Sequence, residues 1–175
     1  MWEFKKFRNQ EFVPLLKFLV EMYSPDSYLE IGIQKGYTFA QISPLVKEAV
    51  GVDPNPLYMS GDIFLGTSEQ YAKSIDSDKI FDLILIDGLH EKSAVLNDVD
   101  MFLPHLRDET GLMLLHDTYP STPSLEGIGY CHDAWKAARD IFKLEKYKDV
   151  EIVTLPGPYA GMSILRKAKK HLHWL

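Results

Sequence analysis

The sequence is poor in features that mark secreted and membrane-spanning proteins. Its single cysteine, Cys131, has no partner for an internal disulfide, which suits a reducing compartment and an ordinary semi-buried thiol. The apolar run Leu83–Ile86 is far too short to span a bilayer, and Lys17 interrupts the N-terminal stretch Phe12–Val20. These absences favour a cytoplasmic protein without a membrane partner.

Basic residues are also in short supply. The 19 Lys and Arg residues face 25 Asp and Glu residues, which gives a net charge of -6. A partner bound mainly through its phosphates requires clustered Lys and Arg, so nucleic acid is not an expected partner. The basic residues near the end belong to a tail, 167–175, which we interpret as a solvated extension.

The overall composition is that of one folded domain spanning residues 1–175. With 46% hydrophobic and 25% charged residues, the chain can bury one core, and no repeat or low-complexity stretch divides it. Apolar residues at helical spacing between Phe12 and Val20 predict an amphipathic helix within residues 1–23 that covers a sheet. The segment Ser24-Pro25-Asp26 ends this helix.

Short apolar runs alternate with helical patterns along the rest of the chain. Predicted strands cover 28–31, 49–53, 63–65, 79–87, 111–115, 150–155 and 162–166. Predicted helices cover 39–46, 93–103 and 134–142, and another begins near Glu69; Pro44 shortens or kinks the first of them. Alternation of this kind indicates an α/β fold.

The segment Tyr28–Thr38 is the strongest local signal in the sequence. An apolar strand there runs into the motif E-x-G-x-x-x-G, which places Glu30 before two glycines. Gly32 can take a positive φ and lets a bound molecule approach the backbone, while Gly36 allows the next helix to pack closely. The motif therefore predicts a cofactor seat, but it lacks the G-x-G-x-x-G fingerprint of dinucleotide enzymes.

Polar residues at the next two strand ends extend this seat. Asp53 lies about 20 residues past the glycine turn, where nucleotide-binding sheets place an acid against ribose hydroxyls; a turn-forming Asp before Pro54 is the alternative. Thr67 and Ser68 follow the third strand. They suit helix capping, with Ser68 as a good N-cap, as well as a ligand-binding loop.

These features resemble the class I S-adenosylmethionine (SAM)-dependent methyltransferases. The resemblance implies a Rossmann-like, doubly wound, mostly parallel seven-stranded sheet whose last strand is antiparallel. It implies that Glu30 holds the ammonium end of the cofactor, that Asp53 binds the ribose, and that Thr67 and Ser68 lie on the adenine side. The implied cofactor-binding residues are Glu30, Gly32, Gly36, Thr38, Asp53, Thr67, Ser68 and Asp87.

Two further strand ends carry candidate catalytic residues. The sequences I-D-G-L-H, ending at His90, and L-L-H-D-T, ending at Thr118, resemble the small-molecule O-methyltransferases of the catechol and caffeoyl-CoA types over residues 26–166. In those enzymes carboxylates hold a magnesium-type ion. The resemblance implies Asp87 as the first metal ligand, Asp117 as the second, and His116 or Thr118 in the third place.

The third place departs from the family pattern. Imidazole is a softer ligand than carboxylate, and Thr is a poor one, so the site holds manganese, iron or zinc, holds magnesium weakly, or is empty. His90 follows Asp87 at the offset where catechol-type relatives place the base that takes the hydroxyl proton. An unperturbed pKa of about 6.5 suits histidine to this role.

The sequence therefore predicts a SAM-dependent methyltransferase that acts on a hydroxyl of a small molecule, with His90 and Asp87 as catalytic residues. Two alternatives remain: a non-catalytic SAM-binding protein and, with less support, a nicotinamide-dependent oxidoreductase. The loop 118–129 is expected to cover the acceptor, which the sequence does not identify. The oligomeric state is open, although related small enzymes often form homodimers.

Overall fold

The computed structural model describes residues 12–157 and 159–168. The first helix, α1, covers Val13–Tyr23 and ends at Ser24, whose φ of 48° breaks the helical path. It buries one face, which confirms the predicted amphipathic helix for this range. The rest of the predicted N-terminal segment, 1–11, and residues 169–175 of the basic tail lie outside the described residues.

The sheet has seven strands in the order β3-β2-β1-β4-β5-β7-β6. Only β7 runs antiparallel to its neighbours, β5 and β6, within this sheet, as the resemblance implied. The bounds are β1 Ser27–Ile31, β2 Glu48–Asp53, β3 Asp62–Leu65, β4 Leu83–Ile86, β5 Leu112–His116, β6 Val150–Leu155 and β7 Met162–Lys167. The Rossmann-like, doubly wound prediction is thereby confirmed.

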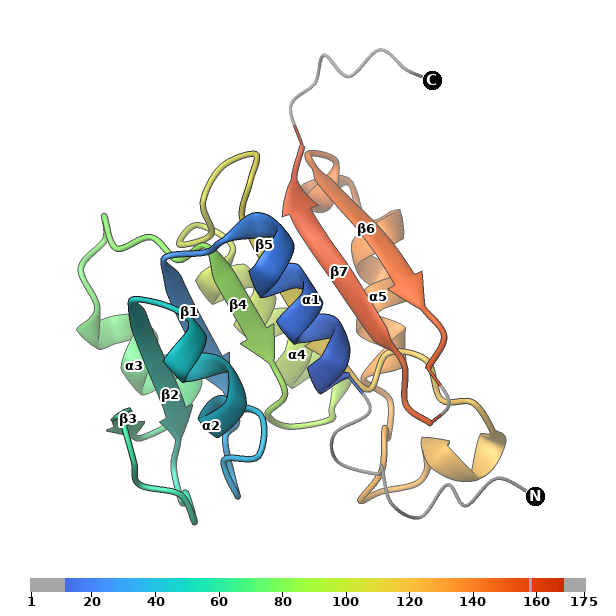
Figure 1. Cartoon of the computed structure of the whole chain (residues 1–175). Coiled ribbons are helices and arrows are strands. Elements are labelled where there is room, and N and C mark those ends of the chain that lie inside the picture. Colours follow the sequence, from blue (N-terminus) through green and yellow to red (C-terminus); the bar gives the residue numbers. More distant parts are fainter. Residues whose placement is uncertain (1–11, 158, 169–175) are drawn as a thin grey trace.

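Helices cover both faces of the sheet (Figure 1). On one face lie α1 and α2 (Phe39–Ile42), and on the other lie α3 (Ser68–Ser74), α4 (Lys92–Phe102) and α5 (Trp135–Lys143). The predicted helix 39–46 is shorter than expected because Pro44 lies in a separate 3-10 turn, η2 (Ser43–Leu45). Further short turns are η3 (Pro123–Glu126) and η4 (Glu145–Tyr147).

The strand order creates a switch point between β1 and β4. From β1 the chain proceeds outward to β2 and β3, whereas from β4 it proceeds to β5 on the other side. Loops leaving the carboxyl ends of β1 and β4 therefore diverge, and ligands of open α/β sheets bind in the resulting crevice. All five residues of β1 and all four of β4 are buried, so these strand ends have a rigid base.

None of the helices within 12–157 and 159–168 combines the length and the apolar character that a bilayer crossing requires.

Candidate active site

The glycine turn after β1 contains three residues with positive φ: Gly32, Gln34 and Gly36. Gly32 has a φ of 88°, and a Cβ there would lie 2.2 Å from the main-chain oxygen of Asp87. Gly32 therefore packs against the end of β4. Its lack of a side chain allows the glycine turn to lie this close to the backbone of Asp87. Gly36, at φ 69°, accommodates the ring of Tyr58, where we had predicted close packing of the following helix.

Glu30 lies beneath this turn and is only 2% exposed. Its carboxyl accepts a hydrogen bond of 2.5 Å from the Tyr28 hydroxyl. Burial raises the pKa of Glu30 to about 8; the Tyr28 hydrogen bond opposes this effect, and the charge of Asp87 adds to it. Thr38, next to α2, is also buried. Cofactor contacts of Glu30 and Thr38 stay predictions.

Asp53 ties the glycine turn to the end of β2. Its Oδ2 accepts from the amide of Gln34 at 2.9 Å, and its Oδ1 accepts from the amide of Asn55 at 2.7 Å. The bond from the Asn55 amide is the one expected if Asp53 serves to form the turn before Pro54. Each carboxylate oxygen keeps acceptor capacity beyond these bonds, so the ribose role stays a prediction.

The loop after β3 corrects one prediction. Thr67, not Ser68, is the N-cap of α3. Its hydroxyl accepts from the amide of Gln70, and the side-chain oxygen of Gln70 accepts from the amide of Thr67. Ser68 is the first helical residue and donates to Asp98 in α4. Burial raises the pKa of Asp98 to about 6, although the Ser68 bond opposes this. Adenine contacts of Thr67 and Ser68 stay predictions.

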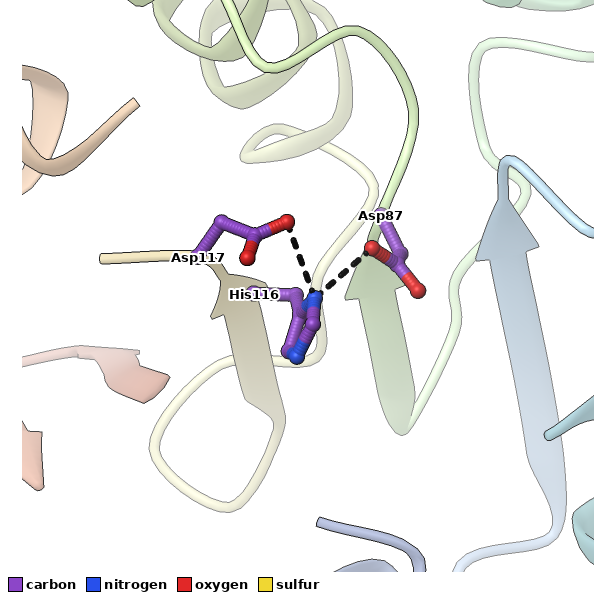
Figure 2. Close-up of side chains that lie close together, drawn as sticks. All are labelled: Asp87, His116 and Asp117. Carbon is purple, nitrogen blue, oxygen red and sulfur yellow. Dashed lines mark hydrogen bonds and ion pairs between the residues drawn. The ribbon is translucent and has the colours of Figure 1, made fainter. Parts of the chain in front are cut away.

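The ends of β4 and β5 bring three polar side chains together (Figure 2). The Nδ1 of His116 lies 2.9 Å from Oδ1 of Asp87 and 3.1 Å from Oδ2 of Asp117. Successive strand residues point to opposite faces, but Asp117 has a φ of 58°, which turns its side chain back beside His116. The backbone at Asp117 therefore places both residues against Asp87.

Charge controls this cluster. Burial disfavours the imidazolium form, but Asp87 and Asp117 outweigh it and raise the pKa of His116 well above its usual value. Burial likewise disfavours ionised Asp117, yet contacts with His116 and His90 lower the pKa of that acid. The two carboxylates thus favour the imidazolium form of His116. The buried Nε2 of His116 has no hydrogen-bond partner among residues 12–157 and 159–168, and the centroid of the Phe12 ring lies 4.2 Å from that of the imidazole.

His90 joins the same cluster from the loop after β4. Its Nδ1 contacts the main-chain carbonyl of Tyr130, so this nitrogen carries the proton in the neutral ring. Its Nε2 lies 3.0 Å from Oδ2 of Asp117. The structure therefore brings His90, Asp87, His116 and Asp117 together, as the sequence predicted.

Thr118 does not join them. Its hydroxyl donates to the carbonyl of Leu115 and accepts from Ser163, so His116 is the side chain that occupies the third place of the predicted triad.

Two contributors were missed in the sequence. Cys131, fully buried, donates to Oδ1 of Asp117 at 3.3 Å, and the main-chain carbonyl of Tyr130 contacts His90. No spacing pattern marks either residue, since both come from an irregular loop. Asp98 had a visible signal, because it falls on the helical face of Val95, Val99 and Phe102. An acid on that face predicts a buried carboxyl.

Comparison with known proteins decides the family. Residues 29–118, just over half of the chain, match a family model described as a methyltransferase domain. The chain belongs to this methyltransferase family. No curated protein sequence matches it. The matched region runs from β1 to the cluster at the end of β5, so it contains the glycine turn and all three residues of Figure 2.

Solved structures share the methyltransferase fold. A Podospora anserina methyltransferase bound to S-adenosylhomocysteine (SAH) aligns with a TM-score of 0.70 at 16% identity, covering 90% of this chain and 78% of that one. A Bacillus cereus O-methyltransferase in complex with SAH aligns with a TM-score of 0.65 at 15% identity, covering 89% of this chain and 80% of that one. A Streptococcus thermophilus rRNA methylase aligns with a TM-score of 0.65 at 11% identity, covering 92% of this chain and 98% of that one. Identities this low establish the fold and leave the acceptor open.

The donors of this methyltransferase fit a divalent ion. One atom from each of Asp87, His116 and Asp117 lies within 4.8 Å of the others. Neighbouring ligands at metal distances of about 2.1 Å are themselves about 3 Å apart, as the imidazole and carboxylate atoms are here. Metal binding requires loss of the His116 proton. One imidazole with two carboxylates favours manganese, iron or zinc over magnesium.

Proposed function

We propose that this protein transfers the methyl group of SAM to a hydroxyl of a small molecule. The observation that carries the proposal is the convergence of His90, Asp87, His116 and Asp117 beside the switch point of the sheet. The glycine turn next to Asp87 and the acid at the end of β2 are the features of a nucleoside-binding edge. SAM, when bound, supplies an electrophilic methyl group on a sulfonium centre.

The chain's own residues orient this cofactor. One amide of the glycine turn, that of Gln34, is fixed by Asp53, which keeps acceptor capacity for ribose hydroxyls. Glu30 lies close enough to Asp87 for the charge of one acid to raise the pKa of the other. A cationic ammonium group bound here would favour the ionised form of Glu30 and lower the pKa of this acid. Alignment and charge compensation are the main contributions of the protein.

His90 accepts the proton of the acceptor hydroxyl. Because Nδ1–H faces the Tyr130 carbonyl, Nε2 is the basic atom of the neutral ring, and its electron pair must turn from the Asp117 carboxylate, 3.0 Å away, to the acceptor hydroxyl before the proton moves. As Nε2 takes the proton, the hydroxyl oxygen forms the new bond to the methyl carbon while the carbon–sulfur bond breaks. Asp117, at 3.0 Å, stabilises the resulting imidazolium.

Asp87, His116 and Asp117 would hold the divalent ion, which lowers the pKa of a coordinated hydroxyl when bound. The ion pair of His116 with both carboxylates supports the alternative of a metal-free protein, since the imidazolium already balances part of their charge. Either form keeps His90 as the proton acceptor.

Calorimetric titration of the full chain with SAM, SAH and NADH, each with and without manganese, tests the proposal. We expect SAM and SAH to bind and NADH not to bind, with a manganese-dependent heat that His116→Gln removes. If neither SAM nor SAH bound at millimolar concentration, the cofactor assignment would be refuted. If SAM bound but no methyl group were transferred to any hydroxylated acceptor, the non-catalytic SAM-binding protein would be favoured.

A further inference from the structure

The two carboxylate oxygens of Asp117 have different neighbours. Oδ2 lies 3.0 Å from Nε2 of His90 and 3.1 Å from Nδ1 of His116, and the contact with His116 is drawn in Figure 2. Oδ1 accepts a hydrogen bond from the Cys131 thiol at 3.3 Å. Because Asp117 is only 5% exposed, these contacts, and not bulk water, determine how its carboxylate lies.

The conformation of Asp117 leaves the orientation of its carboxylate to hydrogen-bond partners. The φ of 58° places the residue in the left-handed region and directs the side chain toward the cluster. Rotation about the last torsion of an aspartate side chain is broad, so its hydrogen bonds set the plane of the carboxylate. A donor on Oδ1 holds that plane while Oδ2 faces the two imidazoles. The Cys131 thiol is such a donor.

Cys131 is itself held in a fixed position. Its amide donates to the carbonyl of Leu125 at 3.0 Å, and its carbonyl accepts from the amide of Ala134 at 3.1 Å. The side chain is fully buried and packs with Leu125 and Ala160 in a small core. The sulfur atom therefore cannot move away from Asp117 unless this core opens.

The residue before Cys131 contacts another member of the cluster. The carbonyl of Tyr130 contacts Nδ1 of His90, whose Nε2 faces Oδ2 of Asp117. Two consecutive residues thus reach His90 and Asp117, one through a main-chain oxygen and the other through a thiol. Burial raises the pKa of Asp117, but His116 and His90 lower it, and the Cys131 bond adds to this lowering. The loop therefore supports both the ionised form and the orientation of this acid.

We infer that Cys131 is a positioning residue whose thiol holds the carboxylate of Asp117 with Oδ2 toward His90 and His116. Cys131 acts only through Asp117 and itself contacts neither the acceptor nor the metal ion. The inference rests on the proposed function, because it concerns Asp117 as a metal ligand and as the partner of His90. Hydrogen bonds to the ligands of a metal commonly contribute about 10- to 100-fold in metal affinity.

Three variants of the full chain test the inference through manganese affinity, measured by calorimetry. Cys131→Ala removes the donor and should weaken manganese binding by about tenfold or more. Cys131→Ser keeps a hydroxyl donor and should recover most of this loss. Leu125→Val is the matched control, because it trims the same small core but leaves the thiol in place, and its manganese affinity should be unchanged. No loss in Cys131→Ala, or an equal loss in either of the other variants, would overturn the inference.

A vibrational measurement tests the same bond without metal or cofactor. Cys131 is the single cysteine of the chain, so the S–H stretching band in the Raman spectrum comes from this thiol alone. We expect a lower frequency in the folded protein than in urea, and Asp117→Asn should raise it, because an amide oxygen is a weaker acceptor than a carboxylate. An unchanged band in Asp117→Asn would overturn the inference.

The two measurements separate this inference from the proposed function. SAH affinity is recorded for every variant, so a failure of cofactor binding, which counts against the proposed function, is distinguished from a loss of the thiol bond. If the unsubstituted protein bound no manganese, the proposed metal site would fail, and the S–H band of Cys131 would decide the inference alone.

Discussion

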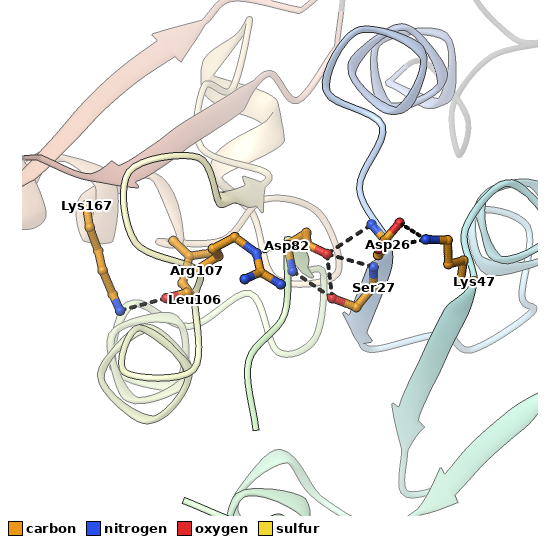
Figure 3. Close-up of polar contacts among 7 residues, drawn as sticks. All are labelled: Asp26, Ser27, Lys47, Asp82, Leu106, Arg107 and Lys167. Carbon is orange, nitrogen blue, oxygen red and sulfur yellow. Dashed lines mark hydrogen bonds and ion pairs between the residues drawn. The ribbon is translucent and has the colours of Figure 1, made fainter. Parts of the chain in front are cut away.

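The strand β4 carries an aspartate at each end, and the two differ in how their charge is satisfied. Asp82, before the strand, accepts from the amides of Asp26 and Ser27 and from the Ser27 hydroxyl, each at 2.9 Å, and also pairs with Arg107 (Figure 3). Asp87, after the strand, faces the imidazole of His116 (Figure 2). The four buried residues between them hold both ends in a fixed relation.

The two aspartates therefore differ in role: Asp82 stabilises the fold, whereas Asp87 is placed for chemistry. Burial disfavours ionised Asp82, but Arg107 and Ser27 outweigh it and lower the pKa of this acid. Its donors are two main-chain amides, a hydroxyl and a guanidinium, so none of them gives up its proton near neutral pH. The partner of Asp87 is a histidine, which can lose a proton to a metal. A pocket of about 480 Å³ borders Asp82 and Arg107, so open space alone does not mark the reactive end.

The largest expected effect comes from Asp87→Asn. Removing the carboxylate charge beside His116 should lower kcat/KM by about 1,000-fold, because the acid either holds the metal or balances the charge at the reacting hydroxyl. The melting temperature should hardly change, since Asp87 is partly exposed at a loop. Steady-state kinetics and thermal unfolding measure the two effects. Full activity in this variant would contradict its assignment.

Asp82→Asn should show the opposite pattern. The amide cannot accept from all four donors and leaves Arg107 without its charged partner, so the free energy of unfolding should fall by about 2 kcal/mol. Urea unfolding measures this loss. Turnover per folded molecule should stay normal, because the substitution lies at the far end of β4. Lost turnover in fully folded protein would show that the two ends are not independent.

Much of the fold could be predicted from the sequence because its signals are local. The buried run of β4 and the inward positions Val95, Val99 and Phe102 on α4 are patterns within one element. The cluster of Asp87, His116 and Asp117 was also predictable, since carboxyl ends of neighbouring parallel strands share one edge of a sheet.

Other contacts were out of reach because they depend on tertiary placement. The Tyr58 ring against Gly36, the Cys131 thiol on Asp117 and the Tyr130 carbonyl on His90 all involve irregular loops. Whether Thr67 or Ser68 caps α3 depends on where the helix begins, and sequence patterns do not locate a helix end to within one residue.

Asp98 sharpens the contrast, because it is a third acid, buried against the reactive end with one hydroxyl donor. Its folded pKa of about 6 exceeds the unfolded value, so ionisation opposes folding, and stability falls as pH rises from about 4 to 6. Asp98→Asn keeps an acceptor for Ser68 and should raise the free energy of unfolding by about 2 kcal/mol at pH 8, with no gain near pH 4.

Urea unfolding across this pH range measures the effect, and Asp100→Asn is its matched control. Asp100 lies two residues further along α4, is exposed, and pairs with Lys146 at 2.7 Å. Its replacement should give no gain at pH 8. A gain of equal size in both variants would show that the pH dependence comes from net charge and not from burial at Asp98.

The smallest effect is expected from Lys47→Ala, at the outer margin of the Asp82 network (Figure 3). Lys47 pairs with Asp26 at 2.9 Å, but the two side chains are 79% and 61% exposed. Asp26 is held independently, since its amide donates to Asp82 and its carbonyl accepts from the amides of Lys47 and Glu48. Removing the ammonium should therefore change the free energy of unfolding by less than about 0.5 kcal/mol in urea titration. A loss as large as that of Asp82→Asn would mean that surface charge, and not the Asp82 carboxylate, holds this end of the sheet.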